Sequence, residues 1–281
     1  MSEILLVDNG SLRADATKQL RKLAQALSVE VGQIIHPVSL QHADKIPVAL
    51  LEGREAQIFS SFMQEYLSQG KRHFIILPLF FGESRAIEYF IQDHLQSLQS
   101  PFNDLFFQIA DVVCPLPEGE PLLVDILYDH IIATAYKHPF SLDNIILVDH
   151  GSPLPSVTAV RQHLAKAVQN KLPMQVKVEQ AVMERRKGKE YLFNGELLKD
   201  CLIKKAKAGE RTAIVSLLFF LAGRHAGTGG DIEEICRSVM SDYPDFNIVT
   251  CPLISEHKKL VSILFARLQG CIQKFSTTQS P

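Results

Sequence analysis

Two histidines and one glutamate occupy places in this sequence where their side chains could bind a metal ion. His150 follows an apolar run in the segment VDHGSP, and His225 lies in the glycine-rich segment LAGRHAGTGGDIEEI. Glu184 follows another apolar run, in QAVMERRKGKE. Two imidazole nitrogens and one carboxylate oxygen, with other coordination positions left open, suit Fe²⁺, Co²⁺, Ni²⁺ or Zn²⁺. The three residues therefore predict a site that binds such an ion.

Each of the three residues also has a plainer interpretation. A histidine can pack in a turn, and a charged run such as the one that starts at Glu184 is often a solvated loop. The glycines around His225 could cradle a phosphate, but they lack a GK[ST] ending and the dinucleotide-binding spacing. No G-x-S-x-G elbow occurs, which disfavours a hydrolase. We expect Asp231 to cap the next helix, with Glu234 completing a capping box.

The chain contains two copies of one sequence pattern. ILLVDNGS at residues 4–11 matches IILVDHGS at residues 145–152, 141 positions further on. Three more matches keep the same order, and they pair residues 29–37 with 176–184, 76–81 with 215–220, and 114–116 with 251–253. Four matches in order indicate an internal duplication. We place the copies at residues 1–138 and 139–281, with a linker near residues 137–143.

Both copies alternate short apolar runs with amphipathic segments. Runs bounded by Gly, Pro or Asp are typical of strands buried on both faces of a parallel sheet. The sequence thus predicts two α/β domains, each a parallel sheet of about four strands flanked by helices. Ligands of such sheets bind beyond the carboxyl ends of the strands. His150, Glu184 and His225 follow the first, second and third strands of the second copy, so we expect them to converge.

The first copy provides an internal control for this site. Alignment of the copies places Asn9 opposite His150 and Ala86 opposite His225, and it places Pro37 opposite the glutamate. Asparagine and alanine cannot replace two imidazoles. We therefore expect one metal site per chain, in the second copy.

Composition excludes several other classes of function. The 281 residues carry a formal net charge of −2 with both signs interspersed, so no global field draws the chain to nucleic acid or an anionic membrane. Five widely spaced cysteines without a CxxC pair are typical of reduced core thiols in the cytosol. The start of the chain lacks a basic leader, and no apolar stretch reaches membrane-spanning length. We expect a cytoplasmic monomer that binds neither nucleic acid nor membrane.

The segments VDHGSP and LLFFLAGRHAGTGGDIEEIC resemble the class II chelatases, which insert cobalt or iron into sirohydrochlorin in the cobalamin and sirohaem pathways. The resemblance covers essentially the whole chain, and the long members of that family are tandem repeats of about this length. It implies two stacked α/β domains with a tetrapyrrole cleft between them. It also implies that His150 and His225 bind the metal, that Glu184 is the acidic residue of the site, and that no organic cofactor takes part.

This chain departs from the family in the copy that holds the histidines. In familiar two-domain members they lie in the N-terminal copy, where this chain has Asn9 and Ala86. We expect the active site to have moved to the C-terminal copy, because two pseudo-symmetric halves that face one cleft can present ligands from either wall. The alternative is a non-catalytic carrier of metal or tetrapyrrole.

Further residues could act on the substrate. A cation can pair with a carboxylate of sirohydrochlorin, and the candidates are Arg185, Arg186, Lys187, Lys189 and Arg224. A solvated basic loop is the alternative for the lysines. Glu184 or a released histidine would accept the protons that leave the macrocycle. His257 could also face the cleft, and its role stays open. Both Co²⁺ and Fe²⁺ accept these ligands, and Ni²⁺ fits as well.

Overall fold

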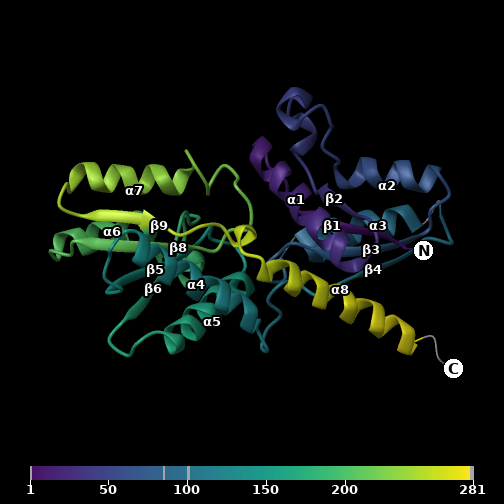
Figure 1. The fold of residues 1–281 in the computed structure, drawn as a ribbon. Helices are drawn as coiled ribbons and strands as arrows, with labels where there is room; N and C mark the ends of the chain where they lie inside the picture. Colours follow the sequence, from purple (N-terminus) through teal and green to yellow (C-terminus); the bar gives the residue numbers. More distant parts are fainter. Residues whose placement is uncertain (1, 85, 100–101, 279–281) are drawn as a thin grey trace. The chain divides into compact units, whose positions relative to one another are not determined.

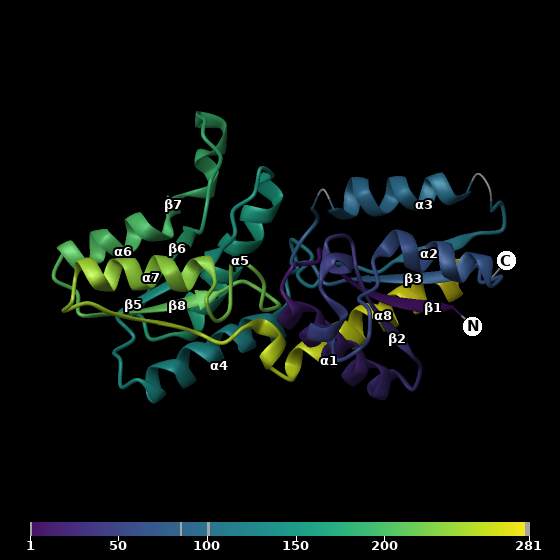
Figure 2. The same cartoon turned by 90° about the horizontal axis from the view of Figure 1, so that it is seen from above.

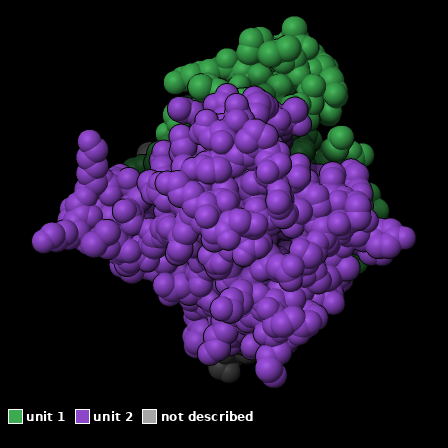
Figure 3. All heavy atoms as spheres, turned by 90° about the vertical axis from the view of Figure 1, so that its left-hand side faces the viewer, with its two compact units in different colours: residues 1–115, 261–281 green, residues 116–260 purple. Residues whose placement is uncertain are grey.

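The chain divides into two compact units, which Figure 3 distinguishes by colour. The computed structural model describes residues 2–84, 86–99 and 102–278. The first unit consists of residues 1–115 and 261–281, and the second unit consists of residues 116–260.

The first unit contains a four-stranded parallel sheet in the order β2-β1-β3-β4. Its strands are β1 (Glu3–Asp8), β2 (Ile35–Ser39), β3 (His73–Pro78) and β4 (Phe106–Ile109). The two central strands, β1 and β3, are buried along nearly their whole length. Burial on both faces explains why these strands are continuous apolar runs and not alternating ones.

Helices cover the sheet of the first unit. They are α1 (Ala14–Val31), α2 (Phe59–Ser68), α3 (Gln92–Gln99) and the short helices η1 (Ala43–Lys45), η2 (Val48–Leu51) and η3 (Ala86–Ile91), the last a π-helix. α2 and α3 share one core cluster, in which Phe59, Phe62 and Leu95 pack with Leu5 and Phe74 of the strands. These elements are labelled or coloured along the chain in Figure 1.

The second unit contains a five-stranded parallel sheet in the order β7-β6-β5-β8-β9. Its strands are β5 (Asn144–Asp149), β6 (Lys177–Val182), β7 (Glu196–Leu197), β8 (Thr212–Leu217) and β9 (Asn247–Thr250). β5 is central and fully buried, and β6 and β8 pair with it on either side. The prediction of two parallel α/β sheets is confirmed, and β7 adds a short edge strand in the second unit.

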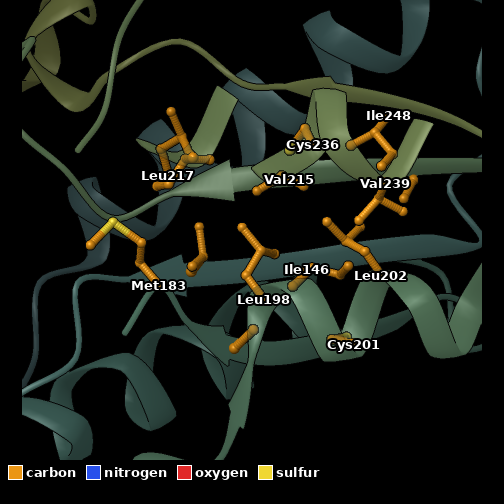
Figure 4. Close-up of a cluster of buried hydrophobic side chains, with 14 of the residues drawn as sticks. Ile146, Met183, Leu198, Cys201, Leu202, Val215, Leu217, Cys236, Val239 and Ile248 are labelled. Atoms are coloured by element: carbon orange, nitrogen blue, oxygen red, sulfur yellow. The ribbon is translucent and has the colours of Figure 1, made fainter. Parts of the chain in front are cut away.

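Paired helices pack on the sheet of the second unit. The helices are α4 (Pro121–Lys137), α5 (Pro155–Lys171), α6 (Leu198–Lys207), α7 (Asp231–Asp242) and the short 3₁₀ helices η4 (Lys189–Asn194) and η5 (Ile254–Glu256). α6 lies beside α7, and their side chains meet those of β5 and β8 (Figure 4). Leu202 and Val239 there face Ile146 and Val215. α4 lies beside α5 and contacts β8.

The last helix of each sequence copy belongs to the unit of the other copy. α4 follows β4 along the chain, yet it packs on α5 and β8 in the second unit. Helix α8 (Lys259–Thr278) follows β9, yet from Val261 onward it belongs to the first unit. There Arg267 donates hydrogen bonds to the carbonyl oxygens of Val112 (2.9 Å) and Val113 (3.0 Å). The predicted boundary between residues 138 and 139 separates the two copies of the sequence pattern, not the two compact units, and it stays a prediction.

Two sequence expectations concern the interior and the membrane. All five cysteines are buried, as expected of core residues. Among the described residues, no helix has the length and apolar character needed to cross a bilayer.

Candidate metal centre

The strand tips of the second unit bring His150 and Glu184 side by side. β5 and β6 pair up to Asp149 and Val182, and the ladder continues beyond them. Met183 N donates to Asp149 O (2.9 Å), and Glu184 N donates to His150 O (3.1 Å). His150 Nε2 consequently lies 3.1 Å from Glu184 Oε1. Both side chains are partly exposed, at 43% and 62%, so a ligand from solvent can reach them.

The turn after β5 requires a glycine. Gly151 has φ +94°, and a Cβ atom at this position would lie 2.0 Å from Glu184 O. Gly10 occupies the same place in the first unit, with φ +85° and a Cβ position 1.9 Å from Gln41 O. Only glycine allows both the positive φ and this close approach of two backbones. The turn thereby holds the residue before it, His150, against the end of the next strand.

This geometry corrects one alignment between the copies. The backbone contact that Glu184 makes with the glycine turn is made in the first unit by Gln41, so Gln41 and not Pro37 is its structural counterpart. Residues 172–176 join α5 to β6, whereas only residues 32–34 join α1 to β2. The copies are thus 143 positions apart at the second strand, which is two more than at the first strand and four fewer than the pairing with Pro37 requires. The first unit therefore has a neutral amide where the second has a carboxylate.

His225 reaches the same place from the loop after β8. The chain leaves β8 alongside β5, because Leu218 N donates to Val148 O (2.8 Å). The rings of His150 and His225 lie with their centroids 4.5 Å apart and their planes inclined by 54°. The structure therefore brings the two predicted histidines together, with Glu184 in contact with the first. The side chain of Ala86, aligned with His225, lies outside the described residues.

The start of α7 differs from the sequence expectation. The N-cap is Gly230, without a side-chain cap, so the predicted capping box of Asp231 and Glu234 is wrong. Asp231 is instead the first helical residue, and its Oδ2 lies 2.7 Å from His225 Nδ1. Arg224 Nε lies 3.7 Å from the same oxygen. The carboxylate thus contacts the imidazole and does not cap the helix. In the sequence, the only sign of this contact is that His225 lies six residues before Asp231.

A buried ion pair supports the turn that carries His150. Arg161 of α5 is 2% exposed, and its Nη1 lies 2.6 Å from Asp149 Oδ1. Its Nη2 donates to Asn194 O, while the Asn194 side chain accepts from Ser152 N (3.0 Å) and donates to Ser152 O (2.8 Å). Burial raises the pKa of Asp149, and the charge of Arg161 opposes that shift. This network was not predicted from the sequence, because Asn194 joins it from η4, far along the chain from both Asp149 and Arg161.

In the first unit, the carboxyl group that corresponds to Asp149 belongs to Asp8 and has different partners. Asp8 ends β1 as Asp149 ends β5, but the repeat places Leu20 where α5 has Arg161. Ser39 Oγ donates to Asp8 Oδ1 (2.6 Å). Burial raises the pKa of Asp8 from 3.8 to about 6, although this hydrogen bond and backbone N–H groups lower it. A carboxylate without a buried cation is therefore costly to ionise.

We expect Asp8 to make the protein less stable as the pH rises from 4 to 6. The pKa of Asp8 is higher in the folded state than in the unfolded state, so the folded state binds the proton more tightly. The stability that this proton contributes is fully present below pH 3.8 and is lost as the pH rises to about 6. The loss is about 3 kcal/mol for a shift of this size. Denaturant unfolding of wild type and Asp8→Asn between pH 4 and 7 measures it. A constant difference between the two proteins would contradict the expectation.

The predicted basic residues after Glu184 lie on an arm, residues 185–195, that leaves the sheet between β6 and β7 (Figure 2). Arg185 Nη1 donates to Gly195 O (2.5 Å) and helps to hold the arm together. The Arg186 guanidinium lies 5.9 Å from the ring centroid of Tyr191. Arg186 and the two predicted lysines, Lys187 and Lys189, are exposed. The arm thus presents cations next to the strand tip that carries Glu184.

His257 is held by contacts with α4 and with the first residue of α8. Its Nε2 lies 3.3 Å from Asp129 Oδ2, and its Nδ1 accepts from Lys259 N (3.2 Å). Its ring also packs edge-on against that of His130, with 5.4 Å between the centroids. Both ring nitrogens of His257 therefore have partners outside the candidate site, and a role for it in the site stays open.

The candidate ligands contact one another directly. Among the residues described, no three or more His, Cys, Asp or Glu side chains are grouped as a ready metal cage. His150 pairs with Glu184, and His225 pairs with Asp231. A side-chain shift that opens the first of these pairs would leave a nitrogen and an oxygen for an ion. The role of these residues as ligands stays a prediction.

Comparison with solved structures identifies the fold. SirB from Bacillus subtilis with Fe³⁺ is 14% identical, with 99% of this chain and 98% of that one covered at a TM-score of 0.70. SirB from B. subtilis subspecies spizizenii with cobalt is 16% identical, with 97% and 96% covered at 0.68. CbiX, the terminal enzyme of siroheme biosynthesis in denitrifying bacteria, is 13% identical, with 95% and 98% covered at 0.59. The chain therefore has the two-domain chelatase fold.

The family follows from the sequence itself. The CbiX family model matches residues 3–133 and again residues 144–271, in agreement with the predicted duplication. The chain belongs to the CbiX family, as its two motifs suggested. No curated protein matches it in sequence.

Proposed function

We propose that this protein inserts a divalent metal ion, Co²⁺ or Fe²⁺, into sirohydrochlorin, as a step of cobalamin or sirohaem biosynthesis. The observation that carries the proposal is the approach of two imidazole rings, those of His150 and His225, to 4.5 Å beyond the tips of neighbouring strands. Membership of the CbiX family supports it. The full-length likeness in fold to SirB, solved with Fe³⁺ and with cobalt, is consistent with it.

His150 and Glu184 supply a place where a metal ion exchanges with a proton. A ring nitrogen and a carboxylate oxygen 3.1 Å apart can share one proton between them. A divalent cation displaces that proton and binds to deprotonated ligands. His225 then completes a set of two nitrogens and one oxygen, and water fills the remaining positions of the metal substrate. Exchange of these waters for pyrrole nitrogens transfers the ion to the macrocycle.

Insertion also releases two protons from the pyrrole nitrogens. A histidine released by the ion accepts one of them, and Glu184 is the proposed acceptor of the other, because its carboxylate loses the metal at the moment when the ring loses its protons. Its 62% exposure gives the proton a route to solvent. The cationic arm, with Arg185 and Arg186, and the exposed Arg224 are proposed to pair with carboxylates of the substrate.

The test is anaerobic incubation of the protein with sirohydrochlorin and either Co²⁺ or Fe²⁺. We expect the absorption spectrum of the macrocycle to change faster than in a mixture without protein, with one of the two metals preferred. Glu184→Gln should slow the reaction by about 10²–10⁴-fold, since it removes the proton acceptor while keeping the side-chain shape.

One control variant and one contrary result define the outcome. Glu210→Gln changes a glutamate just before β8, whose Oε2 accepts a hydrogen bond from Asn144 at the start of β5, and this variant should metallate at the wild-type rate. Binding of the macrocycle and the metal without any acceleration would contradict the proposal and favour a carrier.

A further inference from the structure

The loop that carries His225 is folded back onto the start of α7. Asp231 N donates to Arg224 O (3.1 Å), and Ile232 N donates to His225 O (3.0 Å). These backbone bonds bring residue 231 next to residue 225, where His225 Nδ1 lies 2.7 Å from Asp231 Oδ2. The contact between the two side chains is thus fixed by the path of the backbone.

The contact determines which nitrogen of His225 carries the proton. A carboxylate only accepts hydrogen bonds, so the ring nitrogen beside it must be the donor. Asp231 lies in the first turn of α7, where the helix dipole favours a negative charge. With Nδ1 protonated, the neutral ring of His225 has its lone pair on Nε2.

His150 has the same arrangement with a weaker partner. Its Nδ1 lies 3.0 Å from the carbonyl oxygen of Gly151, which also only accepts. This leaves Nε2 of His225 for an ion, whereas Nε2 of His150 shares a proton with Glu184 until an ion displaces it. At Nδ1, His225 is backed by a charged group and His150 by a neutral one. A charged acceptor makes the imidazole a stronger electron donor toward a metal.

Helix capping does not explain the position of Asp231. The N-cap of α7 is Gly230 and has no side-chain cap. Near the helix start, Gly229 N instead donates to Glu233 Oε2 (2.5 Å). Arg224, at 3.7 Å and with a side chain 79% exposed, is a weak partner for Asp231. His225 is therefore the main partner of the Asp231 carboxylate.

We propose that Asp231 is a positioning residue, which holds His225 in the tautomer protonated at Nδ1 and makes its Nε2 the stronger of the two imidazole ligands. The inference rests on the proposed function, since it concerns the same metal substrate. It adds a residue that acts through His225 and does not itself touch the ion.

The experiment compares wild type, Asp231→Ala and the matched control Glu233→Gln, which alters another acid in the first turn of α7. Titration with Co²⁺, followed by its visible absorption, should give an affinity 10–100-fold lower for Asp231→Ala. The control should bind Co²⁺ like wild type. Asp231→Asn keeps the side-chain shape without the charge, and it should also weaken binding if the alanine variant proves unstable.

A second measurement reports on the tautomer directly. Nitrogen-15 spectra of the metal-free protein, with the His225 signals assigned through His225→Ala, should show Nδ1 protonated in wild type. Asp231→Ala should shift the proton toward Nε2. A proton on Nε2 in wild type, or an unchanged Co²⁺ affinity in both Asp231 variants, would overturn the proposal. A wild type with the expected tautomer and Co²⁺ binding but no metallation would instead refute only the proposed function.

Discussion

Replacing both His150 and His225 by alanine is expected to reduce metallation of sirohydrochlorin to the rate without protein. Loss of a single outer partner of a metal ligand already costs about 10–100-fold in affinity, so loss of two ligands should cost at least ~100-fold. The two rings lie in contact, with no other histidine ring in contact with either among the described residues. The measurements are the initial rate of the spectral change and the Co²⁺ affinity, at saturating macrocycle.

The duplicated sequence offers a matched set of controls. His150→Asn copies the residue that the first unit has at Asn9, and it should lower the rate as the alanine variant does. His138→Ala removes an exposed histidine whose ring packs on Phe140, and it should leave the rate unchanged. A double variant that metallates at the wild-type rate would remove the imidazoles from the mechanism.

Arg161→Leu is expected to lower the free energy of unfolding by about 3–5 kcal/mol, because it leaves the carboxylate of Asp149 buried without its cation. Both side chains are buried, and the pair is 2.6 Å long. The substitution also copies the first unit, which has Leu20 at this position and accommodates its carboxyl group with a raised pKa. Denaturant unfolding followed by circular dichroism at pH 7 gives the loss.

The double variant Arg161→Leu with Asp149→Asn separates charge from packing. It should recover much of the stability at pH 7, because no ion is then left unpaired. In the single variant the folded-state pKa of Asp149 should rise further, since the opposing charge of Arg161 is gone. Its deficit should therefore shrink as the pH falls below neutrality. A deficit that stays the same at pH 5 and in the double variant would argue for lost packing instead.

Much of the site could be predicted because its residues follow strands. The end of a buried apolar run is visible in the sequence, and parallel strands of one sheet end at one edge. His150, Glu184 and His225 could therefore be assigned to that edge, and the structure places the first in contact with the other two. Gln41 was missed because the length of a helix-to-strand connection is not fixed by the strand pattern.

Contacts made by single side chains across the fold were beyond the sequence. Asp231 has the residue type and the sequence position of a helix N-cap, and only the path of the loop places it beside His225. The exchange of α4 and α8 between the units is a second case. The apolar face of an amphipathic helix must be buried against another element, but its sequence pattern does not show in which of two similar domains this happens.

The exchanged helices fix an order in which the two sheets are finished during synthesis. All of the second unit, including α4, has been translated once Leu260 is in the chain. The first unit, whose strands come earlier in the sequence, still lacks α8 at that point, including Leu264 and Leu268, which are buried in the folded protein. Because domains fold as units during synthesis, the half that is made first is completed last.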